Sequence, residues 1–406
     1  MKKQEVSAQW YKQKFDLAKT IQTNIDSHKD FYIEVSHDIH DHPEIGNEEF
    51  YASEKLADIL QQAGFEVELD VAGHKTAFIA RKKASKPGTA VAFLAEYDAL
   101  PGLGHACGHN IIGTTSVAAA IALAEVIDEV GGEVIVLGTP AEEGGPNGSA
   151  KGSFVKHDLL RGIDAALMIH PSNDSALTTP SLAVDVLEFE FFGKPAHSAA
   201  NPEDGINALD GLIQFYNGVN ALRQHVTSDV RIHGVILDGG QAPNIVPDYT
   251  RARFFTRAAK RHHLDEVTKR VIQVAEGAAI QTGTTFKVTN IQNGVDDFLI
   301  NKQFNRVFAR IAEQLDEPVK TDSRGIGSTD AGNISQVLPT IHPYIKIGPS
   351  DLVGHTVEFR EAARSEVGDQ ALIKGAKLIA LTALELYTDQ KLLADIKKEY
   401  EETKQI

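Results

Sequence analysis

A Gly-rich loop near residue 100 carries a carboxylate, a thiol and two imidazoles. The loop, residues 96–110 (EYDALPGLGHACGHN), follows the apolar run Ala90–Ala95, which predicts a buried strand, and precedes an apolar helix pattern. Within it, Cys107 and His109 flank a single glycine. Open α/β sheets place their chemistry at the carboxyl ends of core strands. The loop is therefore the first candidate site.

Two adjacent carboxylates, Glu142 and Glu143, occupy a second loop, TPAEEGG, after a strand predicted at residues 134–138. A solvated acidic turn is the ordinary explanation of such a pair. After a core strand, however, one carboxylate can bind a cation while the other transfers a proton. His170 ends a further predicted strand, and His355 precedes the last helices. Taken singly, each histidine would be an ordinary polar loop residue.

Considered together, these residues form a set of metal ligands. Five nitrogen, oxygen and sulfur donors come from four loops: Cys107, His109, Glu143, His170 and His355. Thiolate and imidazole favour zinc or a similar transition metal over magnesium or calcium. Five ligands exceed the needs of one tetrahedral ion with an open position. They suit two divalent ions that share a bridging ligand and activate a water between them.

The composition excludes several classes of protein. A chain of 406 residues is too long for one ordinary core, so two domains are expected. The net charge of −16 repels phosphate backbones, and no apolar run reaches the length of a membrane span. We therefore expect neither a nucleic-acid partner nor a membrane. A single cysteine and a first segment without the apolar core of a secretory signal predict a cytoplasmic location.

The order of predicted elements indicates two domains of different type. Strand and helix patterns alternate up to residue 183 and resume after residue 296, which predicts an α/β fold with a mostly parallel sheet flanked by helices. Residues 184–295 read as strand, helix, two strands, helix and strand, a small α+β sandwich. The predicted organisation is a metal-binding catalytic domain of residues 1–183 and 296–406, interrupted by an inserted domain of residues 184–295.

Seven motifs follow one another between about residue 37 and residue 370: EYDALPGLGHACGHN, PAEEGG, MIHP, GKPAHSAANPEDGINALD, GGQAPNIVPD, GSTDAG and GHT. With these motifs the chain resembles the zinc-dependent aminoacylase and carboxypeptidase superfamily. The nearest likeness is to its amidohydrolase branch, which includes hippurate hydrolase, indole-acetyl-amino-acid hydrolase and aminobenzoyl-glutamate hydrolase. The resemblance implies that the inserted domain is a lid, and that the enzyme cleaves an amide bond next to a free carboxylate.

The resemblance also implies roles for single residues. By this resemblance, Glu142 corresponds to the family's general base and acid, and Asp98 corresponds to an aspartate that orients a metal-binding side chain. Many members of the superfamily have His-x-Asp where this chain has Glu96-Tyr97-Asp98. We expect Cys107 to be the bridging thiolate. His109 and His170 would then bind one ion, and Glu143 and His355 would bind the other.

The predicted lid supplies a second set of residues. His197 resembles the lid histidine that reaches the active site of the other subunit and stabilises the oxyanion, which implies a homodimer through the lid domain. Asn244 and Arg257 match positions linked with the substrate carboxylate, and a guanidinium fork suits a carboxylate. Arg251 and Arg253 lie on the same strand face as Arg257, and a solvated basic face explains them nearly as well.

These observations predict a metal-dependent amidohydrolase that acts on an N-acyl or N-aroyl amino acid or a dipeptide, with two zinc or manganese ions. A non-catalytic, metal-dependent ligand-binding protein on the same scaffold remains the alternative. A serine hydrolase is not favoured because the chain lacks a G-x-S-x-G elbow after a strand. A dinucleotide-binding oxidoreductase is not favoured because Gly102-Leu103-Gly104 lacks the third glycine. The Gly-rich loop of residues 321–332 is the predicted wall of the acyl pocket.

Overall fold

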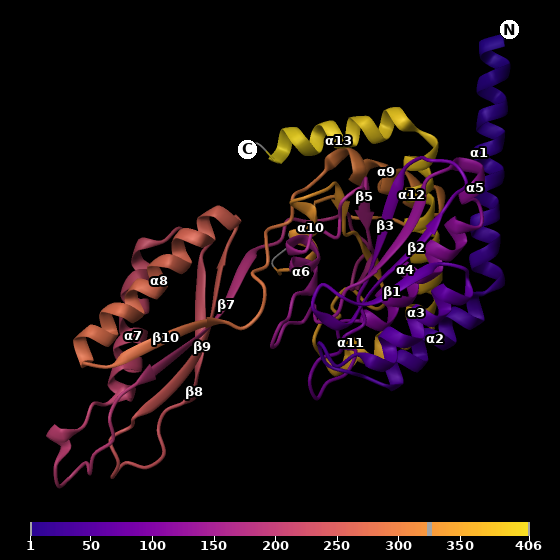
Figure 1. Ribbon diagram of the computed structural model, residues 1–406. Helices are drawn as coiled ribbons and strands as arrows, with labels where there is room; N and C mark the ends of the chain where they lie inside the picture. The colour runs from indigo at the N-terminus through magenta and orange to yellow at the C-terminus, as the bar shows by residue number, and fades with distance from the viewer. Residues whose placement is uncertain (1, 323–326, 405–406) are drawn as a thin grey trace. The chain divides into compact units, whose positions relative to one another are not determined.

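The computed structural model describes residues 2–322 and 327–404, and Figure 1 shows their helices and strands. The described chain divides into two compact units. The first contains residues 2–180, 298–322 and 333–404, and the second contains residues 181–297 and 327–332. Residues 323–326 of the predicted acyl-pocket wall lie outside the described residues.

A six-stranded sheet, as described, forms the centre of the first unit in the order β1-β2-β4-β3-β5-β11. Strand β3 pairs in parallel with β4 and β5, and β5 pairs in parallel with β11, whereas β1 and β2 form an antiparallel edge. A separate two-stranded parallel sheet joins β6 and β12. The strands of this unit are β1 Glu66–Val71, β2 His74–Lys83, β3 Ala90–Ala95, β4 Glu133–Gly138, β5 Ala165–Leu167, β6 His170–Ser172, β11 Thr340–Ile341 and β12 Tyr344–Lys346.

Helices flank this mostly parallel sheet (Figure 1). Helix α4 packs on β3 and β4, and α12 packs against α4 and α9. Helix α10 lies where the chain passes from the second unit back to the first. The helices are α1 Lys2–Ser27, α2 Lys29–Asp41, α3 Phe50–Gln62, α4 His109–Ala124, α5 Ile127–Val130, α6 Ala150–Lys156, α9 Lys302–Gln314, α10 Ala331–Ser335, α11 Val357–Ala362, α12 Glu366–Thr388 and α13 Gln390–Lys404.

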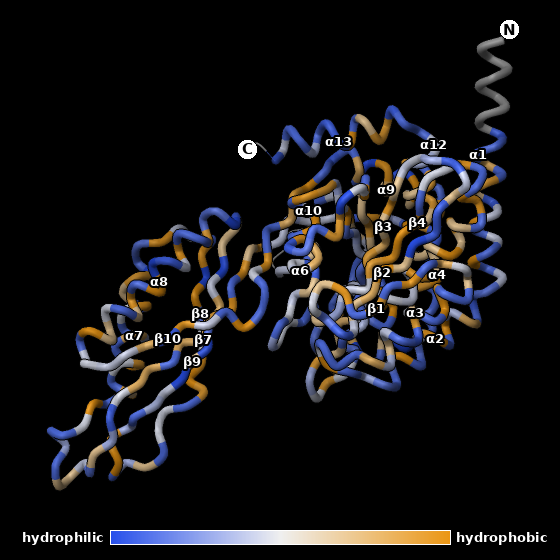
Figure 2. Tube along the Cα trace, in the orientation of Figure 1, coloured by the Kyte–Doolittle hydropathy of each residue, from blue (hydrophilic) through white to orange (hydrophobic). Residues whose placement is uncertain are grey.

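The core of the first unit follows from the apolar sequences of its central elements. Every residue of β3 (AVAFLA) is buried, as a central strand covered on both faces requires. Helix α4 is apolar around its whole circumference, and nearly all of its residues are buried. Figure 2 shows the hydrophobic residues along β3 and β4. A rigid, dry core therefore lies directly beneath the loops that leave these strands.

The second unit is a four-stranded antiparallel sheet covered by two helices. The sheet order is β10-β7-β9-β8, and α7 and α8 pack on one face of it (Figure 1). Phenylalanines fill the space between sheet and helices, with the rings of Phe189 and Phe215 4.4 Å apart. The elements are β7 Ala183–Phe192, α7 Ala208–Leu222, β8 Arg231–Asp238, β9 Tyr249–Ala258, α8 Arg261–Thr282 and β10 Thr285–Asn290.

Two predicted elements are divided in the structure. The apolar helix pattern that follows the Gly-rich loop forms two helices, α4 and α5. The strand predicted to end at His170 stops at Leu167 as β5, and the chain then leaves the main sheet to form β6 beside β12. An apolar run shows burial, but it does not show which neighbouring strand will accept the hydrogen bonds.

No helix in the described part of the chain is both long enough and apolar enough to cross a membrane.

Candidate active site

The loop between β3 and α4 fixes Cys107 and His109. Gly108 stands between them with a φ of 79°, in the left-handed region that glycine adopts without steric penalty. A Cβ at this position would lie 2.5 Å from Cγ of Pro171. A larger residue would therefore displace the loop. His109 is the first residue of α4, and its side chain is fully buried.

Asp98 connects two of the loops. One of its carboxylate oxygens accepts a hydrogen bond from Nδ1 of His109 at 2.9 Å, and the other accepts one from the backbone N–H of Glu143 at 3.0 Å. Burial raises the pKa of Asp98, but the His109 imidazole and the backbone N–H of Glu143 together lower it, so the net shift is downward and favours the ionised carboxylate. Because Nδ1 donates to Asp98, the lone pair of His109 lies on Nε2.

The second loop, which follows β4, presents Glu142 and Glu143. Ala141, the residue before them, has a φ of 57°, which an L-residue adopts only when its surroundings hold it there. The backbone N–H of Ala141 donates to the buried carboxylate of Glu49 at 2.8 Å. Both glutamate side chains are partly accessible, at 12% for Glu142 and 13% for Glu143. The strained turn thus directs two neighbouring carboxylates to the same side of the sheet edge.

The two remaining histidines come from later segments of the first unit. His170 begins β6, and its Nδ1 donates to the carbonyl oxygen of Pro171 at 2.7 Å, which leaves Nε2 with a lone pair. His355 has a φ of 62°, and its backbone N–H donates to the carbonyl oxygen of Ala106 at 2.9 Å. That bond joins the last loop of the site to the loop of Cys107.

The structure brings all five predicted donors together in two groups that share a thiol. The ligand atoms within each group lie within 4.8 Å of one another. The distance from Cys107 Sγ to His170 Nε2 is 3.5 Å, and that from His355 Nε2 to Glu143 Oε1 is 3.4 Å. The two groups are Cys107 with His109 and His170, and Cys107 with Glu143 and His355.

These separations fit a metal ion. Donors of a tetrahedral zinc ion at ordinary bond lengths lie about 3.3–3.6 Å apart. Nε2 of His109 is buried and makes no hydrogen bond with the described residues, and the same holds for Oε1 of Glu143. A buried polar atom without a partner is costly, and a cation would satisfy both atoms. The donor set, its spacing and its unsatisfied atoms all suit divalent ions.

Protons compete with a cation for these donors. Burial raises the pKa of the Cys107 thiol well above its usual range, with the charge of Glu143 adding to the effect. Burial lowers the pKa of His109, but Asp98 and Cys107 raise it by more, so the net shift is upward. Burial lowers the pKa of His170 to about 4, which leaves this imidazole neutral. Metal binding at Cys107 and His109 must therefore release protons.

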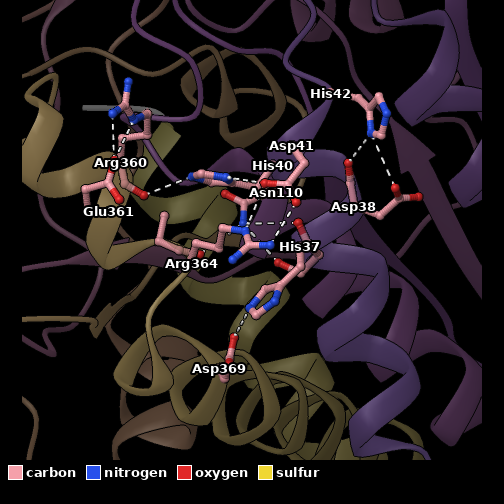
Figure 3. A network of polar contacts seen from close by, with 12 residues as sticks. His37, Asp38, His40, Asp41, His42, Asn110, Arg360, Glu361, Arg364 and Asp369 are labelled. Carbon is pink, nitrogen blue, oxygen red and sulfur yellow. Dashed lines mark hydrogen bonds and ion pairs between the residues drawn. The ribbon is translucent and has the colours of Figure 1, made fainter.

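A polar network behind the site anchors the segment that carries the last histidine (Figure 3). Asn110 donates to Oγ of Ser36 at 2.9 Å and to the carbonyl oxygen of Ala363 at 3.1 Å. Arg364 forms two hydrogen bonds with Asp41 at 2.8 and 2.9 Å. These contacts tie the start of α4 and the turn after α11 to α2. The loop before α11 is thereby held against the rest of the site.

A family model described as peptidase family M20/M25/M40 matches residues 92–385, a range that contains every donor described above. The chain belongs to this family. This M20 protein is therefore a metal-dependent peptidase or amidohydrolase, and it acts with divalent metal ions. Family membership favours the enzyme over the non-catalytic binding protein that the sequence left open.

Relatives of this M20 protein include several hydrolases. It is 36% identical over 318 residues to an Xaa-Arg dipeptidase from Mus musculus, a match that covers 76% of this chain and 73% of the relative. It is 29% identical over 466 residues to one of the subunits of p-aminobenzoyl-glutamate hydrolase from Escherichia coli (strain K12), with 95% of each chain covered. The predicted resemblance to the amidohydrolase branch is thus confirmed.

A solved structure confirms the predicted fold. The crystal structure of a dinuclear metal-binding peptidase of the M20 family from Bacillus subtilis has a TM-score of 0.65 with this protein. The match covers 89% of this chain and 99% of that chain, at 20% sequence identity. At this identity the likeness establishes a shared fold, an α/β unit with an inserted α+β unit.

The sequence reasoning missed three buried polar residues beside the donors. Glu96 and Lys151 form an ion pair at 2.7 Å, and both side chains are 0% exposed. The ring of His342 lies 5.3 Å from that of His170, and burial lowers its pKa to about 3. A signal for His342 exists in the sequence, because Ile-His-Pro follows a strand there as it does at His170.

The predicted substrate residues of the M20 protein lie in the second unit. His197 is exposed, and its Nδ1 accepts hydrogen bonds from the backbone N–H groups of two following alanines at 3.2 Å. Asn244 is close to it in this unit, since its carbonyl oxygen accepts a hydrogen bond from the N–H of Ser198. Arg257 donates to Oγ of Ser328 at 2.9 Å. Unlike Arg257, the other two arginines of this strand face pair with Glu188 of β7.

Proposed function

We propose that this M20 protein hydrolyses the amide bond of an N-acyl or N-aroyl amino acid, or of a dipeptide, with a free carboxylate. The observation that carries the proposal is the pair of donor groups joined at Cys107, with the Glu142 carboxylate 3.8 Å from Nε2 of His109. A carboxylate beyond the ligand set is what a hydrolase needs for proton transfer. A protein that only bound metal and ligand would have no use for it.

Two divalent ions, zinc or manganese, would occupy these groups. Cys107 is the proposed shared ligand, His109 and His170 the further ligands of one ion, and Glu143 and His355 those of the other. Two bound ions would supply Lewis acidity, which makes water more acidic and stabilises negative charge on the attacked carbonyl oxygen. Asp98 keeps His109 in the ligand tautomer and holds the backbone of Glu143.

Glu142 is the proposed general base and acid. Its side chain lies at the edge of the donor groups and remains partly open to solvent, so a water and a substrate can reach it. The carboxylate takes a proton from the attacking water and then gives that proton to the departing amine. One group can serve both steps because the proton it gains in the first is the proton it loses in the second.

We further propose that the inserted unit is a lid that binds the substrate. His197 would stabilise the oxyanion, and Asn244 and Arg257 would hold the substrate carboxylate through N–H donors. The exposed position of His197 leaves its ring free to meet another surface.

The same unit is the proposed dimer interface. Strand β8 is an edge of the antiparallel sheet and carries three consecutive exposed apolar residues, Val235, Ile236 and Leu237, between 42% and 58% accessible. An exposed apolar edge of this kind favours pairing with a second copy. A histidine supplied by the partner would make the dimer necessary for full activity. We also propose a cytoplasmic location, because a thiolate ligand keeps its reduced form there.

The test pairs metal analysis with a panel of substrates: aminobenzoyl-glutamate, hippurate, acetylated amino acids, and Xaa-Arg and Xaa-Lys dipeptides. We expect two divalent ions per chain and hydrolysis of at least one member. Glu142→Gln should lower kcat by about 10²–10⁴-fold with unchanged metal content. Cys107→Ala should lower the metal content. A Glu142→Gln protein that keeps most of its kcat would disprove the assigned role, and unchanged metal in Cys107→Ala would disprove the ligand set.

A further inference from the structure

A buried carboxylate outside the donor groups holds the loop that carries Glu142. The side chain of Glu49 is fully buried and belongs to neither donor group. Its Oε1 accepts a hydrogen bond from the backbone N–H of Ala141 at 2.8 Å, and its Oε2 accepts one from the hydroxyl of Thr76 at 2.8 Å. Burial raises the pKa of Glu49 to about 7, and the charge of Asp98 adds to the effect. Because burying a carboxylate is costly, its contact with the loop calls for an explanation beyond stability.

Glu49 does not serve the helix that it begins. It is the N-cap residue of α3, where a side chain ordinarily accepts a hydrogen bond from the first turn of the helix. The side chain of Glu49 makes no such bond. The backbone N–H groups of Tyr51 and Ala52 donate to the carboxylate of Glu44 instead, each at 3.0 Å. Glu49 is therefore available to a loop 92 positions further along the chain.

The segment before α3 contacts this loop at both of its ends. A Cβ at Gly46 would lie 2.8 Å from Cβ of Ala141, so a larger residue would push the two segments apart. At the far end of the loop, Nδ2 of Asn47 donates to the carbonyl oxygens of Pro146 and Asn147, at 3.0 Å each. The loop is thus attached on either side of its two glutamates.

Two buried carboxylates fix the backbone on either side of Glu142. Glu49 accepts the N–H of Ala141, and Asp98 accepts the N–H of Glu143. The positive φ of Ala141 persists only where its surroundings hold it. With both neighbours fixed, the side chain of Glu142 leaves the loop in a narrow range of directions. It points toward the donor groups, where one of its oxygens lies 3.8 Å from an imidazole nitrogen.

Resting on the proposed function, in which Glu142 transfers the proton, we propose that Glu49 is a positioning residue of the reaction. It holds the backbone of Ala141 so that the carboxylate of Glu142 meets the attacking water. Misplacing a reacting group by about 1 Å can lower the rate about 10²-fold. A residue outside the metal cluster thereby sets the rate of the chemical step, through Glu142 alone.

The test compares substitutions that remove or keep the acceptor. Glu49→Met keeps the approximate size of the side chain but removes both oxygens, whereas Glu49→Gln keeps one oxygen for the N–H of Ala141. Glu49→Asp, which withdraws the acceptor by one methylene, replaces Glu49→Met if that variant does not fold, and the same outcomes apply. Glu399→Met is the matched control, because Glu399 accepts the backbone N–H groups of Lys302 and Gln303, at 3.1 and 2.7 Å, at the start of α9.

Two kinds of measurement are made. The values of kcat and KM are determined at saturating Zn²⁺ with a member of the substrate panel that the wild type hydrolyses. Glu49→Met is also made in the Glu142→Gln background. Amide hydrogen exchange of residues 141–148, followed by mass spectrometry in the metal-free protein, reports how firmly the loop is held without any need for activity.

We expect Glu49→Met to lower kcat by about 10–100-fold, with KM and zinc content unchanged. Exchange of residues 141–148 should become about tenfold faster, because the N–H of Ala141 loses its buried acceptor. Glu49→Gln should restore most of kcat. In the Glu142→Gln background, Glu49→Met should cause little further loss, because two residues that act through one group are not additive. Glu399→Met should lower the melting temperature but leave kcat and the exchange of this loop unchanged.

Unchanged kcat in Glu49→Met, or unchanged exchange of its loop, would overturn the inference. Equal losses of kcat in Glu49→Met and Glu49→Gln would also overturn it, as would an undiminished loss in the Glu142→Gln background. A wild-type protein that hydrolyses no member of the panel would instead overturn the proposed function. The exchange measurement would still decide in that case whether Glu49 holds the loop.

Discussion

Asp98 offers a strict test of how the site is positioned, because its two oxygens serve two different loops. Asp98→Asn keeps the size of the side chain but replaces one acceptor oxygen by an N–H₂ donor. The carboxylate now accepts from Nδ1–H of His109 and from the N–H of Glu143. An amide can accept from only one of these donors, and its own N–H₂ group must face the other. Either orientation of the introduced amide therefore sets two donors against each other.

The magnitude follows from these contacts. A buried donor that loses its acceptor costs about 1–3 kcal/mol, so the metal-free variant should be destabilised by that amount. A changed partner behind a ligating histidine lowers metal affinity by roughly 10–100-fold, which corresponds to about 1.4–2.8 kcal/mol. Because Asp98 contacts both ligand loops, we expect affinity to fall at both ions.

The assay is chelator competition with Zn²⁺, together with thermal unfolding of the metal-free protein. Asp297→Asn is a matched control. Asp297 is a buried carboxylate that accepts the backbone N–H of Arg261 at 2.8 Å, but it belongs to none of the donor groups. The control should lose stability without losing metal affinity. If Asp98→Asn binds both ions with wild-type affinity, Asp98 does not position the ligands.

Three further predictions address backbone, metal and pH. Gly108→Ala should lower the melting temperature and the metal content together, because its Cβ would meet Pro171 and its φ is positive; a protein with full metal content would contradict this. Removing metal should lower the melting temperature, and adding metal back should restore it. Relative to the protein with free metal at 100 times Kd, the free energy of unfolding should fall by about 2.7 kcal/mol. Burial raises the pKa of Asp296 to about 6 from 3.8, so the stability linked to this group is present below about pH 4 and is lost as pH rises through 6. The free energy of unfolding of Asp296→Asn should therefore rise relative to that of the wild type between pH 4 and 7. The difference should be at most about 3 kcal/mol, and less where solvent screens the group. Identical pH profiles of the two proteins in urea unfolding would refute this prediction.

Much of the architecture could be predicted from the sequence because local chemistry specifies it. A short apolar run such as AVAFLA with a Gly- and Pro-rich loop after it favours a buried central strand, and β3 has those bounds. Gly64, with its positive φ of 81°, follows the C-terminal cap of α3 at the position where a glycine commonly ends a helix. The alternating pattern of residues 184–192 likewise predicted β7 of the inserted unit. The sequence is less informative where two pairings compete, as for β5 and β6.

The sequence by itself determined the family and the two kinds of domain. It also predicted the five donors, because Cys, His and Glu at strand ends indicate metal binding by their type and position. Only the tertiary structure decided how those donors group around one thiol, since residues 107, 170 and 355 meet through loop geometry that no local pattern records. It alone also revealed the pair of Glu96 and Lys151. An acid and a lysine 55 positions apart are ordinary surface residues in a sequence. They become significant when folding excludes water from both and leaves one carboxylate oxygen facing a histidine.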